Sequence, residues 1–354
     1  MKKIYLFSFL LIAVFASFLN FLPHINYQYP IHVDEYVHYQ YANNLSSNTP
    51  TYFNQANNSL EKGFHLLLAT LNSFGIQYLN LMILLPIVLT FILSLSIFVL
   101  TRKIFNETAA LFASIFIALL PSSAVILGPM FAVPMSIGLI LIVSGLYLLE
   151  LNSKLFFLPL SALLVIHPPS ALAYFLLINL NLIMKRKKVI SNISLQALAF
   201  LISLPLYLPT FLQKGIQTVD NLSFTQIIPA LFIPRYLGYL TVALIGFGIY
   251  FSAEKKRYDL TIYSLAFLFF IFLFYKLEIE FFLPYARTLF YLFMIFSLLF
   301  GYGCSELISK IKQHKPKLKV IFTITLILLI LTFNFPSKLD STEKVYHIIN
   351  DQDF

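Results

Sequence analysis

Long apolar runs dominate this chain, and they limit its fold more than any other feature. Ile4–Leu22, Leu79–Leu100 and Tyr285–Leu307 are each about 20 residues long, which is the length a helix needs to cross a hydrocarbon core of about 30 Å. Backbone polar groups in lipid must be bonded within their own segment, so such spans are helices. Only 11% of the residues are charged, which excludes an ordinary soluble domain. We therefore predict an all-α, polytopic membrane protein.

The same pattern predicts about eleven spans in total. In chain order they are Ile4–Leu22, Leu79–Leu100, Thr108–Leu127, Pro134–Leu151, Leu155–His167, Ser170–Met184, Ile193–Phe211, Pro229–Phe251, Leu260–Tyr275, Tyr285–Leu307 and Leu318–Phe335. The first run could also be a signal peptide cleaved after Ala16, but its continuation to Leu22 favours a retained span. A transmembrane domain then covers residues 1–335, with an external first loop over 23–78 and a short external tail over 336–354. We expect no sizeable soluble domain.

The basic residues give this topology a direction. With the N-terminus in the cytoplasm, most of the 24 Lys and Arg fall on the inner side, as the positive-inside rule requires. These inner residues are Lys2, Lys3, Arg102, Lys103, Lys154, Lys185, Arg186, Lys187, Lys188, Lys255, Lys256, Arg257, Lys310, Lys312, Lys315, Lys317 and Lys319. We thus predict a multi-pass protein of the cell membrane with its first loop outside. Topology and anionic lipid explain the net charge of +9, so no nucleic-acid partner is needed.

The first external loop carries adjacent carboxylates, Asp34 and Glu35, flanked by His32 and His38. A carboxylate beside the membrane can serve as a general base or hold a divalent cation such as Mg²⁺ or Mn²⁺. Asp34, Glu35 and His32 are the candidate metal ligands. A solvated loop with a helix cap and surface histidines explains the same residues without a site. Farther along this loop, Phe64–Gly75 is too short to span and predicts a helix at the membrane interface.

Three further polar residues fall on the predicted outer side, namely Arg235, Arg287 and His167. Arginine at the outer mouth of a span either snorkels to lipid headgroups, pairs with an acid such as Glu278 or Glu280, or binds a phosphate with its planar fork. His167 precedes two prolines that break an apolar hairpin. Such a break lines a cavity or forms a simple turn. We keep all of these interpretations open.

The order of these motifs resembles that of a known superfamily. Asp34-Glu35, then His38-Tyr39 and Ala42, is similar to the first external loop of GT-C glycosyltransferases, which include protein O-mannosyltransferases and aminoarabinose transferases. The stretch from Gly63 to Gly75 resembles the juxtamembrane helix that closes that loop. Looser matches follow at His167-Pro168 and at Pro284-Tyr285-Ala286-Arg287, leading to Gly301-Tyr302-Gly303. Lys62-Gly63 stands where many members have two prolines.

The resemblance implies a membrane glycosyltransferase with a GT-C-like fold. Its donor would be a sugar on a polyprenyl phosphate held in membrane lipid, and its acceptor a protein, lipid or glycan on the external face. Asp34 would act as base or orient the acceptor hydroxyl for attack with inversion, and Glu35 would support it. The remaining candidates would bind substrate, with the arginines stabilising the departing phosphate. These candidates are His38, His65, His167, Arg235 and Arg287.

Two other classes of protein fit parts of the pattern. Broken helices and scarce charges also occur in transporters and flippases of lipid-linked or small polar substrates. A transporter would carry ionisable residues in mid-span and repeats between its halves, whereas here the ionisable groups collect at one face and no repeat is found. A membrane protease with a Cys nucleophile would need Cys304 near other polar groups. That residue falls near the inner end of its span, where a packing role is expected.

Overall fold

The computed structural model describes residues 3–25, 27, 29–47, 61–122, 128–185, 189–214, 233–277, 283–312 and 316–343. Within these ranges the chain is helical and has no strand, so the all-α prediction is confirmed for this part. The elements are α1 (Lys3–Phe21), η1 (Leu22–His24), α2 (Val33–Ser47), α4 (Lys62–Ser73), α5 (Tyr78–Ile104), α6 (Glu107–Leu119), α7 (Pro134–Glu150), η2 (Lys154–Phe156), α8 (Phe157–Ile166), α9 (Pro168–Lys185), α10 (Val189–Lys214), α11 (Ile233–Leu237), α12 (Tyr239–Glu254), α13 (Asp259–Leu277), α14 (Tyr285–Lys312) and α15 (Pro316–Glu343).

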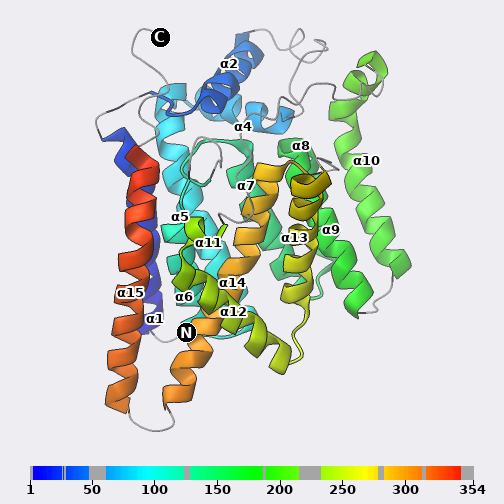
Figure 1. Ribbon diagram of the computed structural model, residues 1–354. Coiled ribbons are helices and arrows are strands. Elements are labelled where there is room, and N and C mark those ends of the chain that lie inside the picture. Colours follow the sequence, from blue (N-terminus) through cyan, green and yellow to red (C-terminus); the bar gives the residue numbers. More distant parts are fainter. Residues whose placement is uncertain are drawn as a thin grey trace.

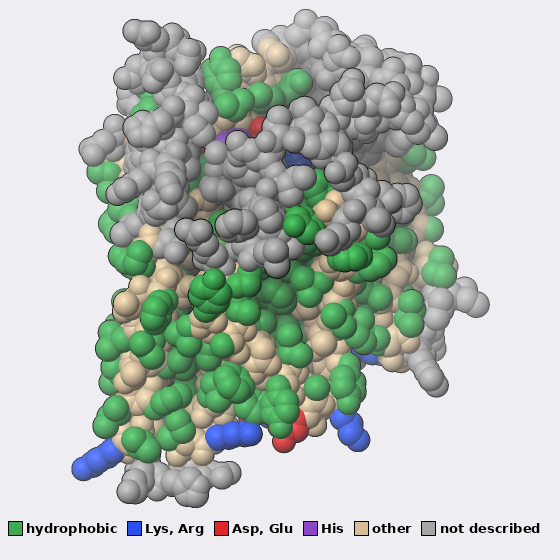
Figure 2. All heavy atoms as spheres, viewed as in Figure 1, with side chains coloured by type: hydrophobic (Ala, Val, Ile, Leu, Met, Phe, Trp, Pro, Cys, Tyr) green, Lys and Arg blue, Asp and Glu red, His purple; other side chains and the backbone are tan. Residues whose placement is uncertain are grey.

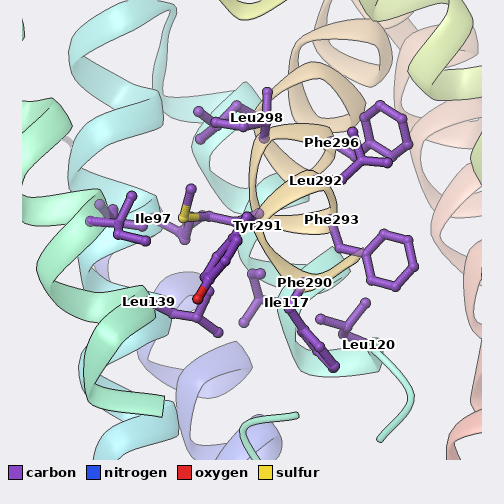
Figure 3. Packing of buried hydrophobic residues seen from close by; sticks show 14 of the residues in the cluster. Ile97, Ile117, Leu120, Leu139, Phe290, Tyr291, Leu292, Phe293, Phe296 and Leu298 are labelled. Atoms are coloured by element: carbon purple, nitrogen blue, oxygen red, sulfur yellow. The ribbon is translucent and has the colours of Figure 1, made fainter. Parts of the chain in front are cut away.

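Helix α14 is the centre of the bundle, where it packs against α6, α12 and α13. Figure 3 shows its large side chains, Phe290 and Phe293 among them, fitting between the neighbouring helices. At the other end of α14, a side-chain carbon on Gly301 or Gly303 would meet a backbone carbonyl of α6 or α12. Small residues at these contacts allow the helix backbones to approach closely, as in other membrane bundles. Cys304 lies in the same packed core, buried and without a disulfide.

Four helices of the described chain are long and apolar enough to cross a membrane. They are Lys3–His24, Tyr78–Ile104, Tyr285–Ile311 and Lys317–Pro336. Several shorter apolar helices lie between them, including α6, α7, α12 and α13. Length and composition therefore support a membrane protein, whereas the count of about eleven crossings stays a prediction.

Several predicted spans differ from the helices that form. The predicted span Thr108–Leu127 stops being helical at Leu119, because Pro121 disfavours a helical conformation at Leu120 (ψ 118°); residues 123–127 lie outside the described part. The span Pro229–Phe251 is divided into α11 and α12 at Gly238, which has φ +82°; its residues 229–232 lie outside the described chain.

The first residues of the predicted external tail are helical. Helix α15 continues through Pro336 to Glu343, and residues 344–354 fall outside the description. Lys338 is buried, and its Nζ donates to Asn20 Oδ1 (2.9 Å) and to the Leu120 carbonyl (3.1 Å). The end of α15 is thus bonded to the end of α1.

The bundle has two chemically different ends. At the lower end in Figures 1 and 2, Lys and Arg side chains gather where α7, α9 and α14 end and where α12 meets α13. Ion pairs join these points: Lys185 with Glu150 (3.0 Å), Lys255 with Glu306 (2.7 Å) and Arg257 with Glu150 (3.5 Å). The loops that sequence assigned to one side therefore do share one end. Which side of the membrane this end faces stays a prediction.

The other end carries the first loop. Helices α2 and α4 contact each other, and α4 lies across the upper end of the bundle against α8 (Figure 1). The interfacial helix predicted over Phe64–Gly75 forms as α4, and Gly75 follows it with φ +90°, a conformation that glycine adopts without strain. This end holds most of the residues singled out from sequence.

Candidate active site

Asp34 and Glu35 lie in the first turn of α2, and they point in different directions because neighbouring residues on a helix are about 100° apart. Glu35 is completely buried. Its Oε2 accepts the backbone N–H groups of Ile31 (2.9 Å) and His32 (3.1 Å), and its Oε1 accepts that of Ala132 (2.6 Å). Glu35 therefore ties α2 to the segment that leads into α7. Burial raises the pKa of Glu35 to about 7, although the three N–H donors oppose the shift.

Asp34 is the accessible carboxylate of the pair, with 46% of its side chain exposed. Its backbone N–H donates to Nδ1 of His32 (3.0 Å), and its Oδ2 lies 4.0 Å from the same nitrogen. The His32 ring in turn packs on Phe131. Asp34 is thus free to meet a substrate, while His32 is held by its neighbours.

Glu61, at the start of α4, is the point on which four elements converge. Its Oε2 lies 3.6 Å from Nε2 of His38 in α2, and its Oε1 lies 3.4 Å from Nε2 of His167. The guanidinium of Arg287, in the first turn of α14, lies 4.0 Å from Glu61 Oε1. We call these residues, together with His65, the Glu61 cluster. His65 joins it because its Nε2 lies 2.9 Å from Nδ1 of His38.

The histidines of the Glu61 cluster are buried and neutral. Burial lowers the pKa of His38 to about 3, and the neighbouring His65 ring and the charge of Arg287 add to the shift. Burial also lowers the pKa of His65 to about 4. Arg287 is then the cation of the cluster, and 35% of its side chain is exposed.

His167 occupies the break between α8 and α9 because proline follows it. A residue before proline avoids the helical region, and His167 has φ −153° and ψ 87°, while Pro168 begins α9. Nδ1 of His167 lies 2.6 Å from Ser170 Oγ and 3.3 Å from the Ser170 backbone nitrogen. Ser170 Oγ lies 2.9 Å from the hydroxyl of Tyr291, which extends from α14 toward α7 in Figure 3.

The Lys62-Gly63 pair explains how Glu61 reaches His167. A side-chain carbon on Gly63 would collide with the backbone of Val165 in α8, so only glycine permits this approach of α4. Lys62 is buried beside it, and its Nζ donates to the Leu206 carbonyl of α10 at 3.5 Å. The residues that replace the usual prolines thus bring α4 against both α8 and α10.

Sequence placed most of these residues on one face, and the structure brings only some of them together. Of the predicted site residues, His38, His65, His167 and Arg287 meet in the Glu61 cluster. Asp34, Glu35 and His32 make the separate contacts described above. The side chain of Arg235, in α11, lies outside the described part of the structure.

Glu61, Ser170 and Tyr291 were not predicted to belong to a site. A usable signal existed for Glu61, because acids are scarce in this chain and it stands directly before the interfacial helix. Serine and tyrosine are common in such a sequence, so nothing in the sequence singles out Ser170 or Tyr291.

The predicted metal ligands do not assemble. Among the described residues, no group of three or more His, Cys, Asp or Glu side chains is arranged to hold a metal ion, and Asp34, Glu35 and His32 do not form one. Both oxygens of Glu35 accept backbone N–H groups, which turns this carboxylate inward.

An apolar groove of about 240 Å³ lies apart from the cluster, between α1, α6 and α15. Its lining consists of Leu11, Ile12, Phe15, Ile115, Ala118, Leu119, Ile327 and Leu331. None of these residues belongs to the Glu61 cluster, so the groove and the cluster are separate features.

The arrangement of helices is similar to that of two solved structures of GT-C-like fold. The chain is similar to two crystal structures of the Archaeoglobus fulgidus oligosaccharyltransferase, one in the apo form (13% identity, TM-score 0.56) and one in complex with Zn and sulfate (14% identity, TM-score 0.53). The matches cover 99% and 98% of this chain but 57% and 54% of those chains, so it spans about half their length. No protein-family model and no curated protein matches the sequence. At this identity the likeness shows the fold alone, and the mannosyltransferase or aminoarabinose-transferase type stays a prediction.

Proposed function

We propose that this protein is a membrane glycosyltransferase that moves a sugar from a polyprenyl-phosphate donor to a protein, lipid or glycan acceptor on the non-cytoplasmic face. Two kinds of evidence support the proposal. The fold resembles that of an oligosaccharyltransferase, and the end of the bundle that carries Asp34 also carries the Glu61 cluster.

The convergence of Arg287, His38 and His167 on Glu61 carries the proposal. An anion attracts the same three donors, and a phosphate that leaves the anomeric carbon gains negative charge as the bond breaks. Arg287 is partly exposed, and its planar fork suits a phosphate. Arg287 would therefore stabilise the departing phosphate, with His167 beside it and Arg235 as a further candidate.

The reaction that follows is a single displacement. The acceptor hydroxyl oxygen attacks the anomeric carbon, the bond from that carbon to the phosphate oxygen breaks, and its electron pair stays on the lipid phosphate. The hydroxyl proton passes to Asp34, or Asp34 orients the hydroxyl for attack. Attack opposite the leaving group inverts the anomeric centre. Glu35 supports Asp34 by fixing the first turn of α2.

A divalent cation has no step in this scheme. One of the similar oligosaccharyltransferase structures contains Zn and sulfate. In the described residues of the present chain the carboxylates and histidines do not form a metal-binding group. Arg287 supplies the positive charge at the cluster instead.

Asp34→Asn tests the proposal most directly. The chain would be reconstituted in liposomes with short-chain polyprenyl-phosphate hexoses, and labelled sugar in the acceptor fraction would be counted. Loss of a general base lowers transfer by about 10²-fold or more, while thermal unfolding in detergent stays unchanged because the side chain is exposed. Asp259→Asn, at the opposite end of the bundle, is the matched control and keeps transfer. Near wild-type transfer by Asp34→Asn would remove Asp34 from the mechanism.

A further inference from the structure

The hydrogen bonds around His167 fix which ring nitrogen carries its hydrogen. The Ser170 backbone N–H can only donate, and it points at Nδ1 of His167 (3.3 Å). Nδ1 therefore presents a lone pair, and the hydrogen of the neutral ring is on Nε2, the nitrogen that faces Glu61 Oε1 at 3.4 Å. The Ser170 hydroxyl, 2.6 Å from Nδ1, donates as well and leaves its oxygen to accept from Tyr291. We call this chain the His167 arm: Tyr291 donates to Ser170, Ser170 donates to His167, and the Nε2–H of His167 faces Glu61.

The His38 arm points the same way. Nε2 of His38 faces Glu61 Oε2 at 3.6 Å, and a carboxylate accepts but cannot donate. The negative charge of Glu61 therefore favours the neutral His38 tautomer with its hydrogen on Nε2, and Nδ1 then accepts from Nε2–H of His65 at 2.9 Å. Unlike the His167 arm, this arm rests on a second histidine, and two neutral imidazoles can reverse the direction of their shared hydrogen bond.

Glu61 is unsuited to be the base of the reaction. Donors face both of its oxygens, and Arg287 lies at ion-pair distance. Only 13% of its side chain is exposed, against 46% for Asp34. The distances of 3.4 to 4.0 Å are longer than formed hydrogen bonds, so these donors keep the capacity to bind a second anion.

We infer that Glu61 is a positioning residue, which holds His38 as a neutral Nε2–H donor, faces the Nε2–H that Ser170 fixes on His167, and aims Arg287 at the phosphate of the donor. The statement about the phosphate rests on the proposed function. The statement about the two histidines does not, because it follows from hydrogen-bond chemistry within the chain. The two parts can therefore fail separately.

Glu61→Gln separates the two histidine arms. An amide offers one oxygen and one NH₂ group, so it can accept from one Nε2–H while donating to the other Nε2. His167 cannot change, because the Ser170 backbone N–H holds its Nδ1 as an acceptor. His38 can, because its partner His65 reverses with it. We expect His38 to become an Nδ1–H tautomer in Glu61→Gln and His167 to stay Nε2–H.

Long-range ¹H–¹⁵N NMR on protein labelled with ¹⁵N-histidine measures this directly. The seven histidines are assigned by single His→Gln variants. Glu61→Asp keeps the carboxylate and is expected to keep the Nε2–H tautomer at His38, a rescue that a packing role would not give. Glu107→Gln, at the other end of the bundle, is the matched control and leaves every tautomer as it was. An Nδ1–H tautomer of His38 in the wild type, or no change in Glu61→Gln, would overturn the inference.

Kinetic measurements test whether Glu61 positions Arg287 toward the donor phosphate. With Arg287 no longer held by a carboxylate, kcat is expected to fall about tenfold in Glu61→Gln, while the KM of the donor changes less, since the departing phosphate is more charged than the bound one. Equal kcat in the two proteins would reject the role toward the phosphate. If no donor is turned over by the wild type, the proposed function fails, whereas the tautomer result stands or falls by itself.

Discussion

Glu35, which is buried, and Glu61, which is partly buried, are two carboxylates at the same end of the bundle, and they are held in opposite ways. Glu35 accepts three backbone N–H groups at 2.6 to 3.1 Å and is fully buried. Glu61 faces three side chains, two histidines and an arginine, at 3.4 to 4.0 Å. Backbone amides neither titrate nor turn away, whereas an imidazole can do both and a guanidinium can turn away.

The difference separates a scaffold residue from a site residue. Short bonds to backbone amides fix the path of two segments relative to each other, and they leave little capacity for a ligand. Longer contacts to ionisable side chains leave donors that a substrate can take over. Two acids that look equivalent in the sequence thus have different expected effects when they are changed, and the following predictions probe that difference from the largest effect to the smallest.

Glu35→Ala is expected to have the largest effect, and on folding. It leaves the N–H groups of Ile31, His32 and Ala132 buried without this acceptor, at a cost of about 1–3 kcal/mol each. Thermal unfolding in detergent should shift to lower temperature, with transfer falling only in step with the folded fraction. Glu35→Gln keeps an acceptor oxygen and should lose less. A stable Glu35→Ala protein without transfer would instead place Glu35 in the chemistry.

Arg287→Ala should show the reverse, with transfer lost and folding kept. Removing one group that stabilises developing negative charge costs about 10²-fold in kcat. The side chain is 35% exposed, so the midpoint of thermal unfolding should stay close to that of the wild type. Arg287→Lys keeps the charge without the planar fork and should recover part of the rate. Full activity of Arg287→Ala would separate the Glu61 cluster from the reaction.

The pH dependence of stability should give the smallest effect. The pKa of Glu35 is about 7 in the folded protein against 4.5 for the unfolded group, so the folded state binds more protons between these values. This group therefore stabilises the protein most below pH 4.5, and its contribution is lost as the pH rises through 7. Glu35→Gln removes that loss. A chemical-denaturation series from pH 5 to pH 8 should show a smaller fall for the variant, and parallel curves would contradict the raised pKa.

The helices themselves were largely predictable, because their signals are local. Apolar length marks α1, α5 and α14, and proline marks the starts of α7 and α9. Hydropathy cannot detect where an apolar chain stops being helical. The apolar pattern therefore predicted a span that continues past Leu119, where α6 ends, and it did not predict the break at Gly238.

The site was predictable only in part, since it depends on long-range packing. His38, His167 and Arg287 could be named because they are polar residues at the ends of apolar runs. Their meeting at Glu61 depends on how closely α4 lies against α8, which a single glycine decides. A linear pattern of residue types does not encode that approach.

The bond between Lys338 and Asn20 has a consequence for how the protein is made. The two residues are 318 positions apart, and Asn20 lies in α1, which leaves the ribosome well before α15. At a synthesis rate of roughly 5–20 residues per second, α15 follows α1 by about 15–60 s. During that interval Asn20, whose amide also donates to Thr90 Oγ1, has not yet formed its bond with the Lys338 ammonium. The contact that joins the ends of α1 and α15 therefore forms only after all the helices between them have been synthesised.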